Sequence, residues 1–239
     1  MKVLCILQAR TSSTRLPGKV LKPILGRPML FRQIERIKRA KRVTGLVVAT
    51  SIEPSDDAIA ELCRGEGIDC FRGDLNDVLG RYYHAAVQYK PEHILRLTGD
   101  CPLSDPEIID QLVELHQAQA NDYTSNVIER TYPNGLDAEI FTFEALARAF
   151  RSAQSDYERE HVTPYLYAEK SPFRKGVLKG KLDWSKLRWT VDYAADFDFV
   201  TKVYETLYPS NPTFSTSDVL ALLQRQPAIG AINEAHAAS

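Results

Sequence analysis

The chain has 239 residues, of which 44% are hydrophobic and 26% charged, and its formal net charge is −1. This composition is that of a globular protein with one large domain or two small ones. It excludes bulk attraction to nucleic acid or to an anionic membrane, and no apolar run approaches the roughly 18 residues of a membrane-spanning helix. The start lacks the apolar region of a signal peptide, and the four cysteines have no CxxC spacing, so we expect reduced thiols and a cytoplasmic location.

The first half of the chain alternates between apolar runs and amphipathic segments. This alternation predicts an α/β fold, with a mostly parallel twisted sheet that carries helices on both faces. The expected strands are 3–7, 45–50, 68–71 and 93–97, and the expected helices are 28–39, 55–64, 78–88 and 106–119. In the second of these helices, Ser55, Asp56 and Asp57 are suitable cap and first-turn residues.

The second half is less regular. Strands are expected at 122–127, 138–141, 174–178 and 187–191, and helices from Thr142 onward and at 158–168, 195–207 and 217–224. The residues after Pro227 are small and polar and are expected to be loosely held. We therefore expect a single domain over residues 1–239, with a core of about 1–130 and 187–225 and an inserted substrate or dimer lobe of about 131–186.

The loop after the first strand is strongly cationic. Arg10, Arg15 and Lys19 fall within ten residues, among Ser, Thr, Pro and Gly. Ligands of open α/β sheets bind at the carboxyl ends of the strands, so this loop indicates a site for a polyanion such as a triphosphate. It is not a Walker loop, because Val20 follows Lys19 where Ser or Thr is required. A basic surface loop is the alternative interpretation.

Two further motifs place a carboxylate at the end of a predicted strand. In RLTGDCPL (96–103), Gly99 permits close backbone approach and Asp100 follows it at the strand's carboxyl end. Mg²⁺ bound to a triphosphate needs only one or two protein carboxylates, which Asp100 could supply if it does not merely cap its turn. In RWTVDY (188–193), Asp192 ends another predicted strand, and Asp196 suits the first turn of the helix that follows.

Together these strings resemble the cytidylyltransferase family of CMP-sugar-acid synthetases, and in particular its SpsF-like branch (spore coat polysaccharide biosynthesis protein F). Residues 10–19 match the R-x-x-S-x-R-L-P-x-K element of sugar nucleotidyltransferases, and residues 99–103 match G-D-x-P-L. Residues 190–197 match T-V-D-x-x-x-D-F, residues 135–139 match G-L-D-x-E, and residues 158–163 match the E-R-E-H-V-T string of the SpsF-like branch.

The resemblance implies a Rossmann-like nucleotidyltransferase fold of the glycosyltransferase-A type, with a small β-rich lobe. It implies an enzyme that transfers CMP from CTP to a sugar acid or sugar phosphate and releases pyrophosphate, for surface polysaccharide synthesis. The implied partners are small nucleotide and sugar substrates, without nucleic acid or membrane, and a homodimer is a candidate assembly. Two alternatives stay open: a glycosyltransferase-A type enzyme that uses a nucleotide sugar, and a non-catalytic nucleotide-binding subunit.

The resemblance also assigns roles to residues. Arg10, Arg15 and Lys19 would be catalytic and would hold the triphosphate, while Asp100 and Asp192 would bind Mg²⁺. The residues expected to contact the nucleotide are Gln8, Ala9, Arg10, Ser13, Arg15, Lys19, Arg72, Gly73, Arg81, Thr98 and Gly99. The residues expected to contact the acceptor are Asp137, Glu139, Arg159 and His161. The alternatives here are solvated carboxylates on an edge strand for Asp137 and Glu139, and a charged helix start for the last two.

Overall fold

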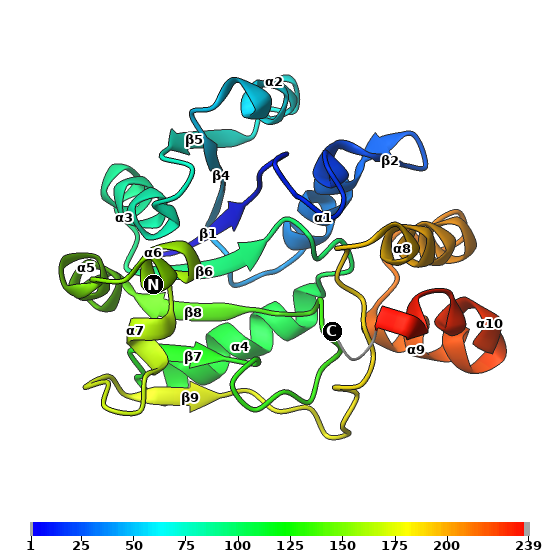
Figure 1. Cartoon of the computed structure of the whole chain (residues 1–239). Coiled ribbons are helices and arrows are strands. Elements are labelled where there is room, and N and C mark those ends of the chain that lie inside the picture. The colour runs from blue at the N-terminus through cyan, green and yellow to red at the C-terminus, as the bar shows by residue number, and fades with distance from the viewer. Residues whose placement is uncertain (1, 237–239) are drawn as a thin grey trace.

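The structure, a computed structural model, describes residues 2–236 and is built on one seven-stranded sheet (Figure 1). Its strands are β1 (Val3–Gln8), β4 (Gly45–Ser51), β5 (Asp69–Gly73), β6 (His93–Thr98), β7 (Tyr123–Ser125), β8 (Glu139–Thr142) and β9 (Lys175–Val177). They lie in the order β5-β4-β1-β6-β8-β7-β9, and every neighbouring pair is parallel except the two pairs that β8 forms. The expected mostly parallel sheet is therefore confirmed. A small ribbon of β2 (Pro23–Ile24) and β3 (Arg27–Pro28) follows the first loop.

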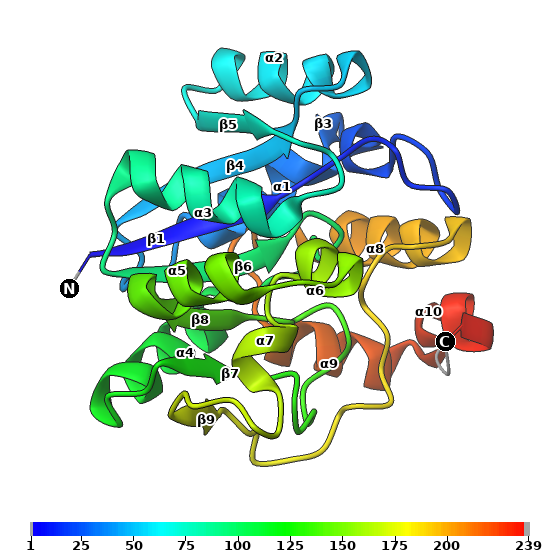
Figure 2. The same ribbon diagram turned by 60° about the vertical axis from the view of Figure 1, so that its left-hand side comes forward.

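Helices cover both faces of the sheet. They are α1 (Met29–Ile37), α2 (Asp57–Gly65), α3 (Val78–Tyr89), α4 (Pro106–Ala118), α5 (Phe143–Ser152), α6 (Asp156–His161), α7 (Pro164–Tyr167), α8 (Ala194–Leu207), α9 (Thr216–Arg225) and α10 (Pro227–Gly230). The 3-10 turns are η1 (Lys19–Leu21), η2 (Pro54–Asp56) and η3 (Ala231–His236). Figure 2 shows α3, α5, α6 and α7 on the side of the sheet nearer the viewer.

Strand β1 shows why the first apolar run of the sequence is continuous. Val3, Cys5 and Leu7 belong to the core that also contains side chains of α1, α4, α8 and α9. Leu4 and Ile6 belong to the opposite core, with side chains of α3, α5 and α7. Because successive side chains of a strand point to opposite faces, a strand covered on both faces needs apolar residues at every position.

Two elements of the second half differ from the prediction. Residues 187–191 form no regular strand, and only Arg188 makes an isolated bridge, to Asn134. The predicted helix 158–168 is divided into α6 and α7 at Val162, whose φ of 69° lies in the left-handed region. Pro164 has no backbone N–H to continue the hydrogen bonding of α6, and it opens α7 instead.

The segment after Pro227 is folded up to residue 236, and the expectation of a loosely held tail is wrong for this part. It forms α10 and η3, in which Ile229 and Asn233 are buried. The Asn233 side chain donates to the Arg188 carbonyl (3.0 Å) and to Asp196 Oδ1 (2.9 Å). These contacts attach the segment to the core, and residues 237–239 lie outside the described part of the chain.

The expected lobe of about 131–186 shares the central sheet with the rest of the chain. It contributes β8, which lies between β6 and β7, and β9, which forms one edge of the sheet. The division of the chain near residues 130 and 187 therefore crosses a continuous sheet, and it stays a prediction. None of the helices within residues 2–236 has the length and apolarity that crossing a bilayer demands.

Candidate active site

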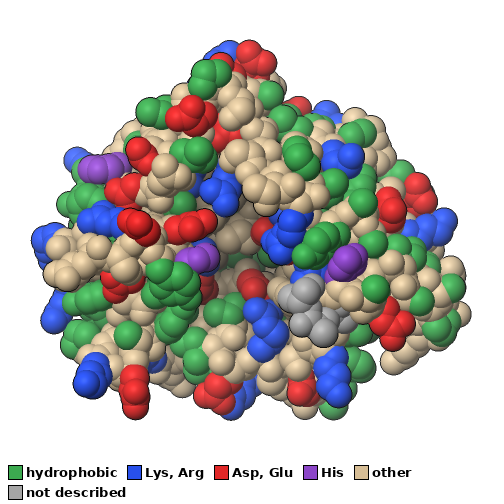
Figure 3. All heavy atoms as spheres, in the orientation of Figure 1, with side chains coloured by type: hydrophobic (Ala, Val, Ile, Leu, Met, Phe, Trp, Pro, Cys, Tyr) green, Lys and Arg blue, Asp and Glu red, His purple; other side chains and the backbone are tan. Residues whose placement is uncertain are grey.

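A cleft of about 420 Å³ opens where β1 and β6 end side by side. These strands are parallel neighbours, with Gln8 paired to Thr98, so the loops that follow them meet at one edge of the sheet. The Gly99 amide donates to the Gln8 carbonyl (2.8 Å), and a Cβ at Gly99 would lie only 3.1 Å from that oxygen. The Val191 amide donates to the Asp100 carbonyl (2.8 Å), which brings in the segment before α8. Figure 3 shows this face hollowed near its centre, with charged side chains around the hollow.

Most of the residues expected to contact the nucleotide line this cleft. They are Gln8, Ala9, Arg10, Ser13, Arg15, Lys19, Arg81, Thr98 and Gly99, and Asp100 and Asp192 join them. Arg72 is not among the lining residues: it donates to the Ser51 and Glu53 carbonyls and pairs with Asp57 at 2.7 Å. Gly73 also lies outside the lining, but a Cβ there would come within 2.7 Å of Arg81 Cγ, so glycine leaves room for the Arg81 side chain.

Lys19 and Asp192 form the charged centre of the cleft. Lys19 Nζ donates to the Val191 carbonyl (2.6 Å) and to Asp192 Oδ1 (3.0 Å), and it lies 3.5 Å from Asp100 Oδ2. Arg15 contacts the same Asp192 oxygen at 2.9 Å. Burial alone would raise the pKa of the Asp192 carboxyl. The charges of Lys19 and Arg15 lower it by more than burial raises it, so the pKa lies below its ordinary value. The carboxylate is therefore ionised at neutral pH.

Arg188 is a second partner of the Asp192 carboxylate, on the oxygen that Lys19 and Arg15 do not contact. No role was predicted for Arg188 from the sequence. Its Nη2 contacts Asp192 Oδ2 (2.9 Å), and it also binds the fully buried Asp196 through Nε (3.0 Å) and Nη2 (3.1 Å). Asp196 accepts the backbone amides of Asp192 and Tyr193 at the start of α8, each at 2.9 Å. Asp196 is thus a first-turn residue, as expected, and it also anchors the turn that presents Asp192. No sequence signal marked this pair, because a spacing of four residues brings side chains together on a helix, and residues 188–192 form none.

Asp100 and Asp192 fit a hard divalent cation. Both carboxylates reach the same Lys19 nitrogen, so their oxygens lie around one region of the cleft. Within residues 2–236, no three His, Cys, Asp or Glu side chains gather into a cage for a metal ion. Two carboxylates that leave the other ligand positions to phosphate oxygens and water are the arrangement that Mg²⁺ usually has with a nucleotide.

A second cleft of about 260 Å³ adjoins the first, and Arg96, Thr98 and His161 line both. Asp137 and Glu139, which were expected to contact the acceptor, line this second cleft. Glu139 is not a solvated carboxylate on an edge strand, because it is buried and β8 lies inside the sheet. Asp137 precedes β8, and its two carboxylate oxygens accept hydrogen bonds from Nη1 and Nη2 of the Arg130 guanidinium group.

Glu139 and Arg96 form a largely buried ion pair in the wall between the clefts. Glu139 also accepts the Tyr123 hydroxyl at 2.5 Å, and Arg96 Nε is buried without a hydrogen-bond partner. The sequence contained Arg96 within a recognised motif but gave it no function. The signal that could have pointed to a functional role for Arg96 was a single arginine within the otherwise apolar run ILRL (94–97).

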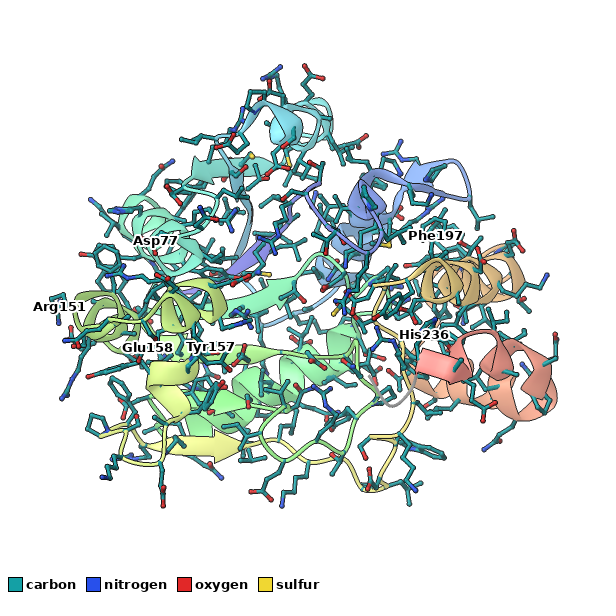
Figure 4. The ribbon with its side chains drawn as sticks, viewed as in Figure 1. Asp77, Arg151, Tyr157, Glu158, Phe197 and His236 are labelled. Carbon is teal, nitrogen blue, oxygen red and sulfur yellow. The ribbon has the colours of Figure 1, made fainter. Side chains whose placement is uncertain are left out.

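The predicted acceptor residues Arg159 and His161 both lie on helix α6, but their side chains have different surroundings. His161 lies at the junction of the two clefts, whereas Arg159 lines neither of them. Arg159 instead pairs with Asp77 at 3.4 Å and donates to the Phe150 carbonyl at 3.1 Å. Figure 4 shows Asp77 near the start of α3, beside α6. Glu160, to which the sequence gave no role, lines the larger cleft and contacts Arg10 at 3.7 Å.

The chain is similar to known cytidylyltransferases in sequence and in fold. The family model described as "Cytidylyltransferase" matches residues 4–214. The chain is 33% identical over 232 residues to the spore coat polysaccharide biosynthesis protein SpsF of Bacillus subtilis, which covers 94% of this chain and 95% of that protein. It is 30% identical over 185 residues to a 3-deoxy-manno-octulosonate cytidylyltransferase of Chlamydia trachomatis, which covers 72% and 71%. The solved structure of a cytidylyltransferase from Leptospira borgpetersenii superposes with a TM-score of 0.91 at 35% identity, over 96% of each chain.

Proposed function

Because this chain belongs to the cytidylyltransferase family, we propose that it transfers CMP from CTP to a sugar acid or a sugar phosphate, with release of pyrophosphate, for surface polysaccharide synthesis. The observation that carries the proposal is the cleft in which Arg10, Arg15 and Lys19 face Asp100 and Asp192. Three cations beside two carboxylates suit a triphosphate with its divalent ion. A relative that makes a CMP derivative of 3-deoxy-manno-octulosonate supports a sugar acid as the acceptor.

In the proposed reaction, a hydroxyl of the acceptor attacks the α-phosphorus of CTP. A new P–O bond forms, the bond between the α-phosphorus and the bridging oxygen breaks, and pyrophosphate leaves. Lys19 is held in place by the Val191 carbonyl and Asp192, so its charge is already oriented before the phosphates bind. Arg10 and Arg15 would bind the outer phosphates. Asp100 and Asp192 would hold Mg²⁺, which offsets phosphate charge and lowers the pKa of the attacking hydroxyl.

The two alternatives lack support in the site. A non-catalytic nucleotide-binding subunit predicts the loss of a charge in the loop or at a metal position, yet all five charged groups line one cleft. A glycosyltransferase does not need a triphosphate-sized cluster that ends in Lys19. The four cysteines are free thiols, which suits the reducing cytoplasm that we propose as the location. A homodimer is also part of the proposal.

Pyrophosphate release tests the proposal directly. The enzyme with Mg²⁺ should release pyrophosphate from CTP in the presence of a sugar acid or a phosphosugar, and much less with UTP, ATP or GTP. Calorimetric titration with each nucleotide should rank CTP first. Tighter binding of ATP or GTP than of CTP would overturn the assignment of the base.

Arg81 is the arginine that we propose for contact with the base. Its side chain is buried, with the residue 3% exposed, it lines the cleft, and its Nε and Nη1 have no hydrogen-bond partner. Cytosine offers carbonyl and ring-nitrogen acceptors to such free donors. Arg81→Met should weaken CTP binding by roughly tenfold, as expected for the loss of one charge-assisted hydrogen bond. Arg72→Met is the matched control, because Arg72 lies outside the cleft, and calorimetry should show nearly normal affinity for it. Equal losses in the two variants would contradict the assignment.

The acceptor residues are tested by separating the two substrates. Asp137→Asn and His161→Gln should raise the KM for the acceptor by about tenfold, since each removes one polar contact, and should leave CTP affinity nearly unchanged. Arg159→Gln is the comparison variant: the Arg159 side chain pairs with Asp77 and lines neither of the two clefts, so a smaller change in the acceptor KM is expected. If Asp137→Asn and His161→Gln abolish nucleotide binding instead, the two half-sites have been assigned to the wrong clefts.

A further inference from the structure

Asp56 is a buried carboxylate that the proposed reaction does not use. It ends η2, directly before α2, is 0% exposed, and forms no ion pair with any residue of 2–236. Its Oδ1 accepts hydrogen bonds from the backbone amide and the hydroxyl of Thr11, both at 2.7 Å. Its Oδ2 accepts the amide (3.2 Å) and the hydroxyl (2.5 Å) of Ser51, at the end of β4. One carboxylate thus joins the first loop to the second strand of the sheet.

Thr11 stands at the base of the cationic loop. Its carbonyl accepts the amides of Ser13 and Gly18, each at 2.9 Å, so the chain closes on itself between Thr11 and Gly18. Arg10 precedes this closure and Lys19 follows it, with Arg15 inside. The placement of Thr11 therefore fixes where the loop that carries the three cations begins and closes, while Arg15 and Lys19 are also held by Asp192.

Packing holds this loop at one point, where the half-buried Leu16 lies against the core. None of the residues 10–18 is buried, whereas Ala9 before them and Lys19 after them are. Apart from the Leu16 contact and the ion pairs of Arg10 with Glu160 and of Arg15 with Asp192, the loop depends on hydrogen bonds. Those at its base converge on Asp56, and Thr11 Oγ1 also lies 2.9 Å from the Ser55 carbonyl. Only an ionised carboxylate accepts hydrogen bonds at all four positions, because an amide would present its NH₂ group to donors on one side.

From this geometry we infer that Asp56 is a positioning residue for the cationic loop. Through Thr11 it clamps the loop to β4 and so maintains the spacing at which Arg10, Arg15 and Lys19 meet the phosphates of CTP. The inference rests on the proposed function for the identity of the ligand, but the clamp itself does not depend on it. Burial raises the pKa of Asp56, yet the hydrogen bonds from Ser51 and Thr11 bring it below its ordinary value, in agreement with an ionised acceptor.

The two sides of the carboxylate provide a matched test. Thr11→Val keeps the shape of the side chain and removes the hydroxyl donor on the loop side, whereas Ser51→Ala removes the hydroxyl donor on the sheet side. Thr11→Val should raise the KM for CTP and lower kcat/KM for CTP by roughly tenfold, with the acceptor KM little changed. Ser51→Ala should lower the melting temperature by a similar amount to Thr11→Val. It should leave the KM for CTP near that of the wild type, because the Ser51 amide and the full burial of Asp56 still hold the carboxylate, and both of its contacts to Thr11 remain. Asp56→Asn should show both defects.

A second readout needs no catalysis. Trypsin cleavage after Arg10 and Arg15, followed by mass spectrometry without nucleotide, should be several-fold faster in Thr11→Val than in Ser51→Ala. If both variants change the KM for CTP and the cleavage rate equally, or if Thr11→Val changes neither, the clamp is refuted even when Asp56→Asn fails to fold. Failure of the proposed function looks different: the wild-type enzyme would then release no pyrophosphate from CTP, while the cleavage comparison would still report on the clamp.

Discussion

Replacing Lys19 with alanine is expected to slow turnover by about 100-fold at every Mg²⁺ concentration, the loss typical of removing one preorganised charge-stabilising donor. The side chain of Lys19 is only 9% exposed and contacts the Val191 carbonyl, Asp192 and Asp100. Its loss leaves Asp192 with Arg15 and Arg188, so the carboxylate stays paired and the main deficit is the missing charge at the phosphates. The measurement is kcat across a Mg²⁺ series at saturating CTP and acceptor.

Lys22→Ala is the control for this variant. Lys22 lies three residues further along, with its ammonium group 5.3 Å from the centre of the Phe197 ring, and it does not line the cleft. Turnover close to that of the wild type is expected. Recovery of Lys19→Ala activity by high Mg²⁺ would instead mean that Lys19 acts by organising the metal site rather than by contacting phosphate.

Asp100→Asn and Asp192→Asn should fail in a different way, with a higher requirement for Mg²⁺. The Mg²⁺ concentration for half-maximal activity should rise by at least roughly tenfold, the size of loss seen when even the outer partners of a metal are disturbed. Asp192→Asn should be the more damaging of the two, because three cations contact Asp192, whereas Lys19, at 3.5 Å, is the only cation of residues 2–236 that contacts Asp100. The double variant should lose much less than the product of the single losses, since the second change acts on a site that is already broken.

Turnover across a Mg²⁺ series, together with calorimetric Mg²⁺ titration in the presence of CTP, measures this effect. Asp198→Asn is the control, because this aspartate lies exposed on α8, two residues after Asp196. Near-normal activity with unchanged Mg²⁺ dependence in either single variant would remove that residue from the metal site. Strictly additive losses would mean that the two aspartates act independently.

The convergence of the cationic loop with Asp100 was accessible to sequence reasoning. An apolar run followed by charged residues indicates a strand that ends in a loop, and parallel strands end at a common edge. The structure pairs β1 with β6 in register, with Gln8 opposite Thr98, and so brings the two loops together. Asp192 was found through the family pattern, and its strand does not exist as such, because backbone contacts to Asn134 and Asp100 hold this segment instead.

The roles of other residues of the site could not be predicted from the sequence, since these roles depend on partners far away in the chain. Arg72 and Arg81 look alike in the sequence, but Arg72 contacts Asp57 and two carbonyls. Arg81 lines the cleft and has two buried nitrogens with no hydrogen-bond partner among residues 2–236. Arg159 turns toward Asp77, which lies 82 residues away. Asp56 was interpreted as a helix cap, yet it binds Thr11 across 45 residues.

The sequence was therefore sufficient for the main strands and helices of the first half and for the motifs, because apolar periodicity, turn residues and strand ends are properties of short segments. The partner of each charged side chain could be seen only in the tertiary structure. A buried or half-buried charge must find a partner, and that partner is supplied by whichever segment the fold brings beside it. The same physics makes Glu139 the buried partner of Arg96 rather than a solvated carboxylate, and it places Asn233, from a tail that looks unstructured, against Asp196.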